Sequence, residues 1–300
     1  MKTSPQVTVI IPTYNWSGVL PYSIGSALRQ TFADFEVLVV GDGCTDDSEA
    51  VVRAVGDERV RWVNLPANTG HQSGPNNEGL RQARGELIAY LGHDDLWLPH
   101  HLSCLLAAIE AGADLAFGIV ERIVPGVSKA PAPPGLKYFP GQWLPPTGVV
   151  HRRRVTERVG GWGDYRALST LPEVDLWRRA YEHGFQFAFV PRLTAFKFPA
   201  SKRPNVYRET PHHEQAEWFE KIEREPDLEA SELVGLLASA VNIPVWHEQP
   251  YPELTRDYLS EMARRFKVRL DGLVRRTPSA PVQGEEVEAA RLFKGLRPKL

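Results

Sequence analysis

Cysteines and long apolar runs are scarce in this chain, and each scarcity excludes a class of protein. Cys44 and Cys104 are the two cysteines among 300 residues, which is too few for a disulfide scaffold or a four-cysteine zinc site. No apolar stretch reaches the roughly 18 residues that a membrane-spanning helix needs, and the apolar run that ends at Pro12 is too short for a signal peptide. We therefore expect a cytoplasmic protein.

The sequence also lacks an excess of charge of either sign. It has 35 Lys and Arg against 37 Asp and Glu, a formal net charge of −2, so its electrostatics give no reason to expect a nucleic-acid partner. Hydrophobic residues make up 42% and charged residues 24% of the chain, a balance typical of folded globular proteins. This length suffices for one large α/β domain with an appended subdomain.

Two kinds of hydrophobic pattern alternate over roughly the first 120 residues. Apolar, largely β-branched runs predict buried strands at 7–11, 35–40, 60–64, 86–91 and 114–118. Apolar residues at helical spacing predict helices at 17–30, 46–55, 73–84 and 99–111. Strands that alternate with helices indicate an α/β fold, with a mostly parallel sheet covered by helices on both faces.

The pattern changes in the second half. Residues 124–146 are rich in proline and glycine and predict a long irregular connection. Beyond it the clear patterns are a strand that enters a short helix at 147–158, a helix ended by Gly184 at 172–183, strand structure on either side of Pro191 at 185–198, and an apolar helical stripe at 253–270. From residue 211 onward the chain is therefore expected to be mostly helical.

The loops that leave the first, second and fourth strands are the expected ligand site, because open parallel sheets bind ligands at the carboxyl ends of their strands. The glycines around Asp42 do not complete the dinucleotide fingerprint, and no Gly-x-x-x-x-Gly-Lys-Ser/Thr phosphate loop occurs. A phosphorylated ligand would then be held through a divalent cation. Asp94 and Asp95 suit Mg²⁺ or Mn²⁺, which take carboxylates together with phosphate oxygens.

Short motifs follow one another along roughly residues 5–200. In the first half they are 9–15 (Val-Ile-Ile-Pro-Thr-Tyr-Asn), 26–35, 42–47 (Asp-Gly-Cys-Thr-Asp-Asp), 68–70, 77–79, 85–91 and 94–95. In the second half they are 149–153, 160–162 and 173–177. Each motif is weak alone, but their joint order and spacing are specific. By these motifs the chain resembles the inverting family 2 glycosyltransferases of the GT-A fold.

The resemblance implies a Rossmann-like GT-A sheet and a set of donor-site residues. The residues it implies for nucleotide binding are Pro12, Thr13, Tyr14, Asp42, Asn68, Asn77 and Asp94. It implies that Asp95, helped by Asp94, holds Mn²⁺ or Mg²⁺ on the diphosphate. For the catalytic base, which takes the proton of the acceptor hydroxyl, it implies Glu173 first and Asp175 second.

Three positions depart from the commonest family pattern. Gly92 stands where many members have the first Asp of an Asp-x-Asp motif, and Gly41 replaces another common Asp. Asn76 stands where an Arg often precedes the Asn of the 77–79 motif, so one phosphate-facing charge is missing. The acidic doublet of the acceptor half is changed as well, since Pro172 precedes Glu173.

Several of these acids also have a structural interpretation. Asp42 with Gly43 suits a tight turn, and Asp94 and Asp95 suit the cap of the helix that follows. Residues 170–173 (Thr-Leu-Pro-Glu) match a capping box with proline in the first helical turn. A helix start and a catalytic base are compatible, because a helix N-terminus favours an ionised carboxylate.

Histidines near the acidic pair raise the alternative of a zinc or di-metal hydrolase. His100 and His101 are adjacent on the predicted helix and point in different directions, so we expect them on the surface. His151, with the two arginines that follow it, is interpreted either as a basic cluster that offsets diphosphate charge or as part of an exposed surface. Trp143 is among the tryptophans nearest the expected cleft, where it either stacks on a sugar ring or packs in the core.

The last forty residues are basic, with ten Lys or Arg against five acids over 261–300. A basic amphipathic helix can lie on an anionic membrane surface, which suits an enzyme that acts on a lipid-linked acceptor. The alternatives are a helix packed on the domain and a homodimer contact.

The function implied is transfer of a sugar, most often from a UDP-sugar, to an acceptor hydroxyl with inversion. Residues 1–118 would form the nucleotide-sugar half, 119–210 the acceptor half and 211–300 a C-terminal helical extension. The partners are a nucleoside diphosphate sugar and a saccharide or lipid-linked acceptor. The alternatives are a sugar-nucleotide-binding protein without turnover and a metal-dependent hydrolase or nucleotidyltransferase.

Overall fold

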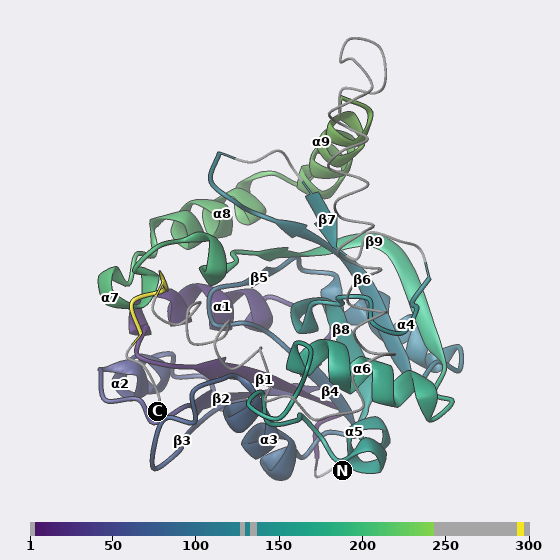
Figure 1. The fold of residues 1–300 in the computed structure, drawn as a ribbon. Helices are drawn as coiled ribbons and strands as arrows, with labels where there is room; N and C mark the ends of the chain where they lie inside the picture. Colours follow the sequence, from purple (N-terminus) through teal and green to yellow (C-terminus); the bar gives the residue numbers. More distant parts are fainter. Residues whose placement is uncertain (1–3, 127–129, 133–136, 243–292, 297–300) are drawn as a thin grey trace, which may run out of the picture.

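The computed structural model describes residues 4–126, 130–132, 137–242 and 293–296. Its centre is a nine-stranded sheet in the order β3-β2-β1-β4-β8-β6-β9-β5, with β7 paired to β6 (Figure 1). The expected apolar stripe at 253–270 lies outside the described residues.

The first half of the chain builds the parallel part of the sheet. β1 (Val7–Thr13) pairs in parallel with β2 (Phe35–Gly41) and with β4 (Leu87–Tyr90), while β3 (Val60–Asn64) pairs with β2. The chain therefore reverses its direction of travel across the sheet between β1 and β4. The predicted α/β fold is confirmed, and the switch point lies where the candidate loops leave β1 and β4.

The helices of this half follow the predicted segments with shorter ends. They are α1 (Leu20–Leu28) after a 3₁₀ turn η1 (Ser17–Val19), α2 (Ser48–Ala54), α3 (Ser73–Gln82) and α4 (His101–Glu110). The strand pleat divides the buried residues between two faces. Val7, Val9 and Ile11 pack with α1 and α4, whereas Ile10 packs on the opposite face with α3.

The second half makes the sheet mixed. β8 (Val149–Arg152) runs antiparallel to β4 and to β6 (Leu115–Arg122), and β9 (Phe187–Lys197) runs parallel to β6. β9 passes through Pro191 as one strand, because the register against β6 shifts next to that residue. Two short strands were not predicted: β5 (Leu96–Trp97) and β7 (Ala130–Ala132).

The remaining described elements are mostly helical, as predicted. They are η2 (Pro146–Gly148), α5 (Arg153–Val159), α6 (Pro172–Glu182), η3 (Ala200–Lys202), α7 (Val206–Glu209), α8 (His213–Arg224) and α9 (Leu228–Asn242). Within the described part of the chain, no helix has both the length and the apolar character needed to cross a bilayer.

Candidate functional site

Asp42 follows directly after β2 and organises a second loop of the chain. Its carboxylate is 4% exposed and accepts hydrogen bonds from Asn68 Nδ2 at 2.9 Å, from Thr69 at its backbone N (2.8 Å) and Oγ1 (2.7 Å), and from Gly70 N at 3.2 Å. Its own amide donates to Thr13 O at 2.8 Å. The structure thus brings three predicted donor-site residues, Thr13, Asp42 and Asn68, to one edge of the sheet.

The loop after β1 is fixed to the loop after β2. Asn15 adopts a left-handed φ of 42°, and its Oδ1 accepts a hydrogen bond from Thr45 N at 2.8 Å. Pro12 and Tyr14 are partly exposed on either side of buried Thr13. These contacts hold the first two candidate loops together where β1 and β2 end.

His93 is a site residue whose neighbours the sequence did not reveal. Its Nδ1 lies 2.8 Å from Thr13 Oγ1 and its Nε2 lies 3.3 Å from Tyr207 Oη. Burial lowers the pKa of His93 to about 4, so the ring is neutral at physiological pH. It links the loop after β4 to β1 and α7.

Asp95 is fully buried and forms an ion pair with Lys197, whose side chain is 21% exposed. Its Oδ2 accepts from Lys197 Nζ at 2.9 Å and from Thr147 Oγ1, and its Oδ1 accepts from Phe198 N at 3.0 Å. The ammonium of Lys197 is already paired with the oxygen that a cation would need. This geometry favours a structural role for Asp95 over the metal-ligand role expected from the sequence.

Asp94 has different surroundings from its neighbour. It is 7% exposed, and burial, together with the adjacent Asp95 carboxylate, raises the pKa of Asp94 to about 7. No cation among the described residues forms an ion pair with it. Asp94 is therefore the carboxylate of the acidic pair that would gain most from a bound cation.

The carboxylates of this site could hold a divalent cation only together with a bound phosphorylated molecule. The described residues contain no group of three or more His, Cys, Asp or Glu side chains able to hold a metal ion. One carboxylate with the phosphate oxygens of a ligand is a common arrangement for Mg²⁺ and Mn²⁺. The residues present fit that arrangement and do not form an all-protein metal cage.

The structure explains the glycine in place of the first Asp of the Asp-x-Asp motif. A Cβ at Gly92 would lie 2.5 Å from Asp95 Oδ2 and 3.2 Å from Asp94 Oδ1. A side chain at this position would displace the carboxylate that Lys197 holds. Glycine at position 92 therefore leaves room for the Asp95–Lys197 ion pair, whereas the Asp that is common at this position would disturb it.

Glu173 lies in the first turn of α6 and its carboxylate is held by neutral donors. It is 7% exposed and accepts from Trp143 Nε1 at 3.0 Å and from Gln72 Nε2 at 3.4 Å. The predicted capping box is not confirmed, because the N-cap residue is Leu171 and no side chain caps the helix. Pro172 in the first helical position helps to start the helix instead. The contact with Trp143 is a role that the sequence did not predict.

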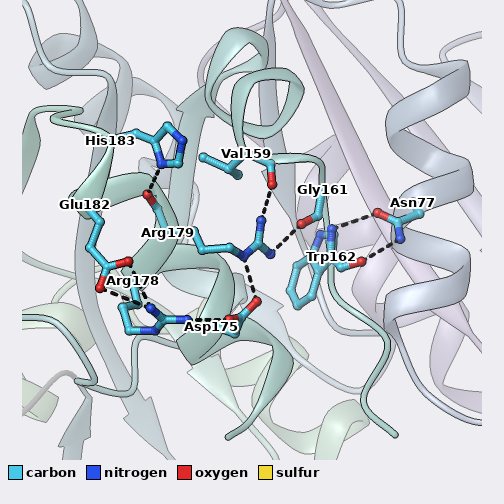
Figure 2. Close-up of polar contacts among 9 residues, drawn as sticks. All are labelled: Asn77, Val159, Gly161, Trp162, Asp175, Arg178, Arg179, Glu182 and His183. Atoms are coloured by element: carbon cyan, nitrogen blue, oxygen red, sulfur yellow. Dashed lines mark hydrogen bonds and ion pairs between the residues drawn. The ribbon is translucent and has the colours of Figure 1, made fainter. Parts of the chain in front are cut away.

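Asp175 has a structural environment. It pairs with Arg178 and Arg179, each at 2.8 Å, and Arg179 also donates to the backbone oxygens of Val159 and Gly161 (Figure 2). These bonds connect α6 to the end of α5 and the turn after it. The geometry therefore favours Glu173 over Asp175 as the base.

The side-chain amide of Asn77 is hydrogen-bonded to the backbone of the protein itself. Its Nδ2 donates to Trp162 O and its Oδ1 accepts from Trp162 N, both at 2.9 Å (Figure 2). The amide thus fixes α3 to the turn between α5 and α6. These two bonds give Asn77 a positioning role in place of the nucleotide contact expected for it.

The ammonium of Lys197 interacts with acids from both halves of the chain. Burial would lower its pKa, but the charges of Asp95, Asp94 and Glu173 outweigh that effect and raise the pKa of Lys197. Glu173 makes the smallest of these contributions, so its charge lies within electrostatic reach of Lys197. Gln72 follows the 68–70 loop that Asp42 holds, and it donates a hydrogen bond to Glu173. Gln72 therefore connects Glu173 to the end of β2.

Two expectations about basic residues and histidines are wrong. Arg152 pairs with Leu87 at the amino end of β4, the edge opposite to the site, and donates to Ile109 O at 2.8 Å, so the 151–153 cluster does not face a diphosphate at the carboxyl edge. His151 is fully buried in the core. His101 is buried too, and it stacks on Trp97 with ring centroids 4.1 Å apart.

Comparisons with a solved structure and with a family model identify the fold and the family of this domain. Staphylococcus aureus TarS, residues 1–349 in complex with UDP-GlcNAc, matches with a TM-score of 0.56 and 19% identity, over 77% of this chain and 70% of that one. Residues 8–154 match the model of glycosyl transferase family 2. The chain therefore carries a glycosyl transferase family 2 domain with the GT-A fold.

Two relatives with curated names match part of the chain. An uncharacterized glycosyltransferase of Nostoc sp. is 31% identical over 51% of this chain and 53% of its own length. The Escherichia coli UDP-Glc:alpha-D-GlcNAc-diphosphoundecaprenol beta-1,3-glucosyltransferase WfgD is 34% identical over 32% of this chain and 38% of its own length. The chain thus spans about half or less of these relatives.

Proposed function

We propose that this chain transfers a sugar from a nucleoside diphosphate donor, a UDP-sugar first among them, to an acceptor hydroxyl with inversion at the anomeric carbon. The observation that carries the proposal is the buried Glu173 carboxylate, which neutral donors hold and which forms no ion pair with a cation among the described residues. The name of the WfgD relative, which states a UDP-glucose donor, supports the choice of nucleotide.

Glu173 is the proposed base. The acceptor oxygen attacks the anomeric carbon while its proton passes to a Glu173 carboxylate oxygen. The bond from that carbon to the diphosphate oxygen breaks, and its electron pair leaves with the nucleoside diphosphate. Trp143 and Gln72 donate to the carboxylate and orient it, which keeps the accepting oxygen in place for the transfer.

The nucleotide is proposed to lie over the carboxyl ends of β1 and β2. Pro12 and Tyr14 flank this edge, and Asp42 keeps the 68–70 loop closed beside it through four hydrogen bonds. Asp94 is the proposed ligand of Mn²⁺ or Mg²⁺, and such a cation supplies Lewis-acid neutralisation of diphosphate charge when bound.

The acceptor is proposed to be a lipid-linked saccharide. WfgD is named for a diphosphoundecaprenol-linked acceptor, and an enzyme of this kind works at a membrane surface. Peripheral contact through the basic 261–300 segment stays a prediction, since most of that segment lies outside the described residues.

The test is a turnover assay with UDP-glucose, UDP-GlcNAc, GDP-mannose and dTDP-glucose, with Mn²⁺ and polyprenyl-diphosphate GlcNAc as acceptor. We expect acceptor-dependent release of the nucleoside diphosphate with at least one donor. Nucleotide binding without turnover on a wide acceptor panel would instead identify a binding protein. Pyrophosphate release from a sugar phosphate and a nucleoside triphosphate would identify a nucleotidyltransferase.

A further inference from the structure

Arg122 is the last residue of β6 and lies at the same edge of the sheet as the candidate site. β4 and β6 each pair antiparallel with β8, so the two strands run in the same direction and end at the same edge. Arg122 is paired in register with Lys197 on β9, and residues paired in this way project their side chains from one face of the sheet. Arg122 therefore projects from the same face as Lys197, which contacts Asp95.

Among the described residues, the guanidinium of Arg122 has no partner of opposite charge. Its Nε is buried, and no described residue accepts a hydrogen bond from it. The neighbouring Lys197 differs, because Asp95 pairs with it at 2.9 Å. A buried N–H without an acceptor costs free energy of folding, and a charged one costs more. The residue as a whole is partly exposed, so an anionic ligand has access to this unpaired cation.

An aromatic ring connects Arg122 to the proposed base. The guanidinium carbon lies 5.9 Å from the centre of the Trp143 ring, within the range of a cation–π contact. The indole Nε1 of Trp143 donates to Glu173 Oε1 at 3.0 Å. One indole therefore separates the unpaired cation from the carboxylate that is proposed to take the proton of the acceptor hydroxyl.

The position of Arg122 favours the acceptor over the donor as the source of the anion. Asp42 and Asp94, where the donor is proposed to lie, follow β2 and β4, whereas β8 separates β4 from β6 in the sheet. The acceptor hydroxyl has to contact Glu173, and Trp143 lies between that carboxylate and Arg122. In a saccharide linked to a lipid through a diphosphate, the phosphates adjoin a sugar of the acceptor. Guanidinium groups bind phosphate through two parallel hydrogen bonds.

We propose that Arg122 is an acceptor-binding residue, whose guanidinium contacts the phosphates of a diphosphate-linked saccharide on the far side of Trp143 from Glu173. This inference rests on the proposed function and deepens it, because it makes the negative charge of the acceptor a determinant of recognition. The contact also places the acceptor sugar beside Trp143, with its hydroxyl toward Glu173.

The test is calorimetric titration of the full chain, saturated with UDP and Mn²⁺, with two GlcNAc analogues that share an octyl chain. One analogue carries a diphosphate between the sugar and the chain, and the other is the neutral octyl glycoside. Arg122→Met should weaken binding of the diphosphate analogue by about tenfold, the effect of losing a hydrogen bond to a charged group, and leave binding of the neutral glycoside unchanged. Arg122→Lys should recover part of the affinity, because it keeps the charge without the paired geometry.

Two controls exclude an indirect effect. Arg224→Met removes an arginine of α8 whose side chain is 75% exposed, and it should change neither titration. The unfolding temperature of Arg122→Met should equal or exceed that of the wild type, because the substitution removes no hydrogen bond or ion pair to a described residue. A lower unfolding temperature would identify a structural role and overturn the inference.

The remaining outcomes separate this inference from the proposed function. Equal affinity for the diphosphate analogue in the wild type and Arg122→Met overturns the inference and leaves the proposed function standing. An equal loss for both analogues also overturns it, as does a lower affinity of the variant for UDP, because Arg122 would then act on the shape of the site or on the donor. A wild-type chain that binds no UDP contradicts the proposed function, and the inference fails with it.

Discussion

Glu173 and Asp175 lie two residues apart in the first turn of α6, yet their surroundings are opposite. Two arginines neutralise Asp175, whereas an indole N–H and an amide hold Glu173. The Asp175 oxygens are both engaged by guanidinium groups, so they are not free to contact an acceptor hydroxyl. Of the two acids, Glu173 is therefore the one that we propose as the base.

Substitution of the two acids should separate catalysis from stability. Glu173→Gln keeps the size of the side chain but removes the base, so kcat should fall by about 10²- to 10⁴-fold while UDP affinity stays unchanged. Asp175→Asn should instead lower the free energy of unfolding by about 1–3 kcal/mol, because it leaves charged donors unsatisfied. Steady-state kinetics and chemical denaturation measure the two effects. A larger loss of kcat in Asp175→Asn would reverse our assignment.

The ionised carboxylate of Asp94 should lower the free energy of unfolding of the metal-free protein. The pKa of Asp94 is about 7 in the folded protein, which is higher than the pKa of an Asp in the unfolded chain. As the pH rises between these two values, the unfolded chain loses its proton first, so the free energy of unfolding falls. The full loss of stability is reached above pH 7. Asp94→Asn should therefore raise the unfolding temperature at pH 8 by at least about 2 °C. The gain should shrink toward pH 4. Thermal melts with a chelator measure it, and a variant less stable than the wild type at pH 8 would contradict the pKa direction.

The candidate site was only partly predictable from the sequence. The sequence placed Asp42 and Asp94 at the carboxyl edge, because loops that follow parallel strands meet there. It did not distinguish Asp95 from Asp94, since the difference depends on Lys197, which is distant in sequence and reaches Asp95 only through the pairing of β5 with β9. Asn77 was likewise assigned to the ligand although its partner is the Trp162 backbone.

At the scale of elements, β5 and β9 are held next to the site by a buried charge pair. Asp95 directly precedes β5, and Lys197 is the last residue of β9. Asp95 also receives the amide of Phe198, so the carboxylate fixes both strand ends. This anchor positions the loop that carries His93 and Asp94.

Breaking the anchor should destabilise the fold. Asp95→Asn leaves the Lys197 ammonium buried without its partner, and the free energy of unfolding should fall by about 3 kcal/mol. The double substitution of Asp95→Asn with Lys197→Met should recover part of that loss, because no unpaired charge then remains. Denaturant titration of the wild type, the single variant and the double variant measures the effect. A fully stable Asp95→Asn would contradict the structural role.

Elements were predicted best where the local pattern is strong. β1 and β2 are continuous apolar runs, so strand and burial follow from the residues themselves. β5 is two residues long and forms only because β9 lies beside it. Because of Pro191, the sequence predicts two separate strand segments in 185–198. The structure instead has one strand there, because the register between β6 and β9 shifts next to Pro191. These features depend on tertiary pairing, which no local window contains.

At the scale of the whole molecule, the candidate site lies at one edge of the sheet. The acids Asp42 and Asp94 follow strands that end at the carboxyl edge. Arg152 and Arg153 lie at the amino edge, where Glu86 and Glu157 lie beside them. These arginines are therefore on the side of the sheet away from the proposed diphosphate.

The most direct test of the account is a crystal structure of the chain with UDP and Mn²⁺, with the metal located by its anomalous scattering. We predict one manganese peak bound to Asp94 and to the diphosphate, with the uridine over the ends of β1 and β2. Asp95 should stay paired with Lys197. A nucleotide bound elsewhere, or a manganese ion on Asp95 with Lys197 displaced, would contradict the account.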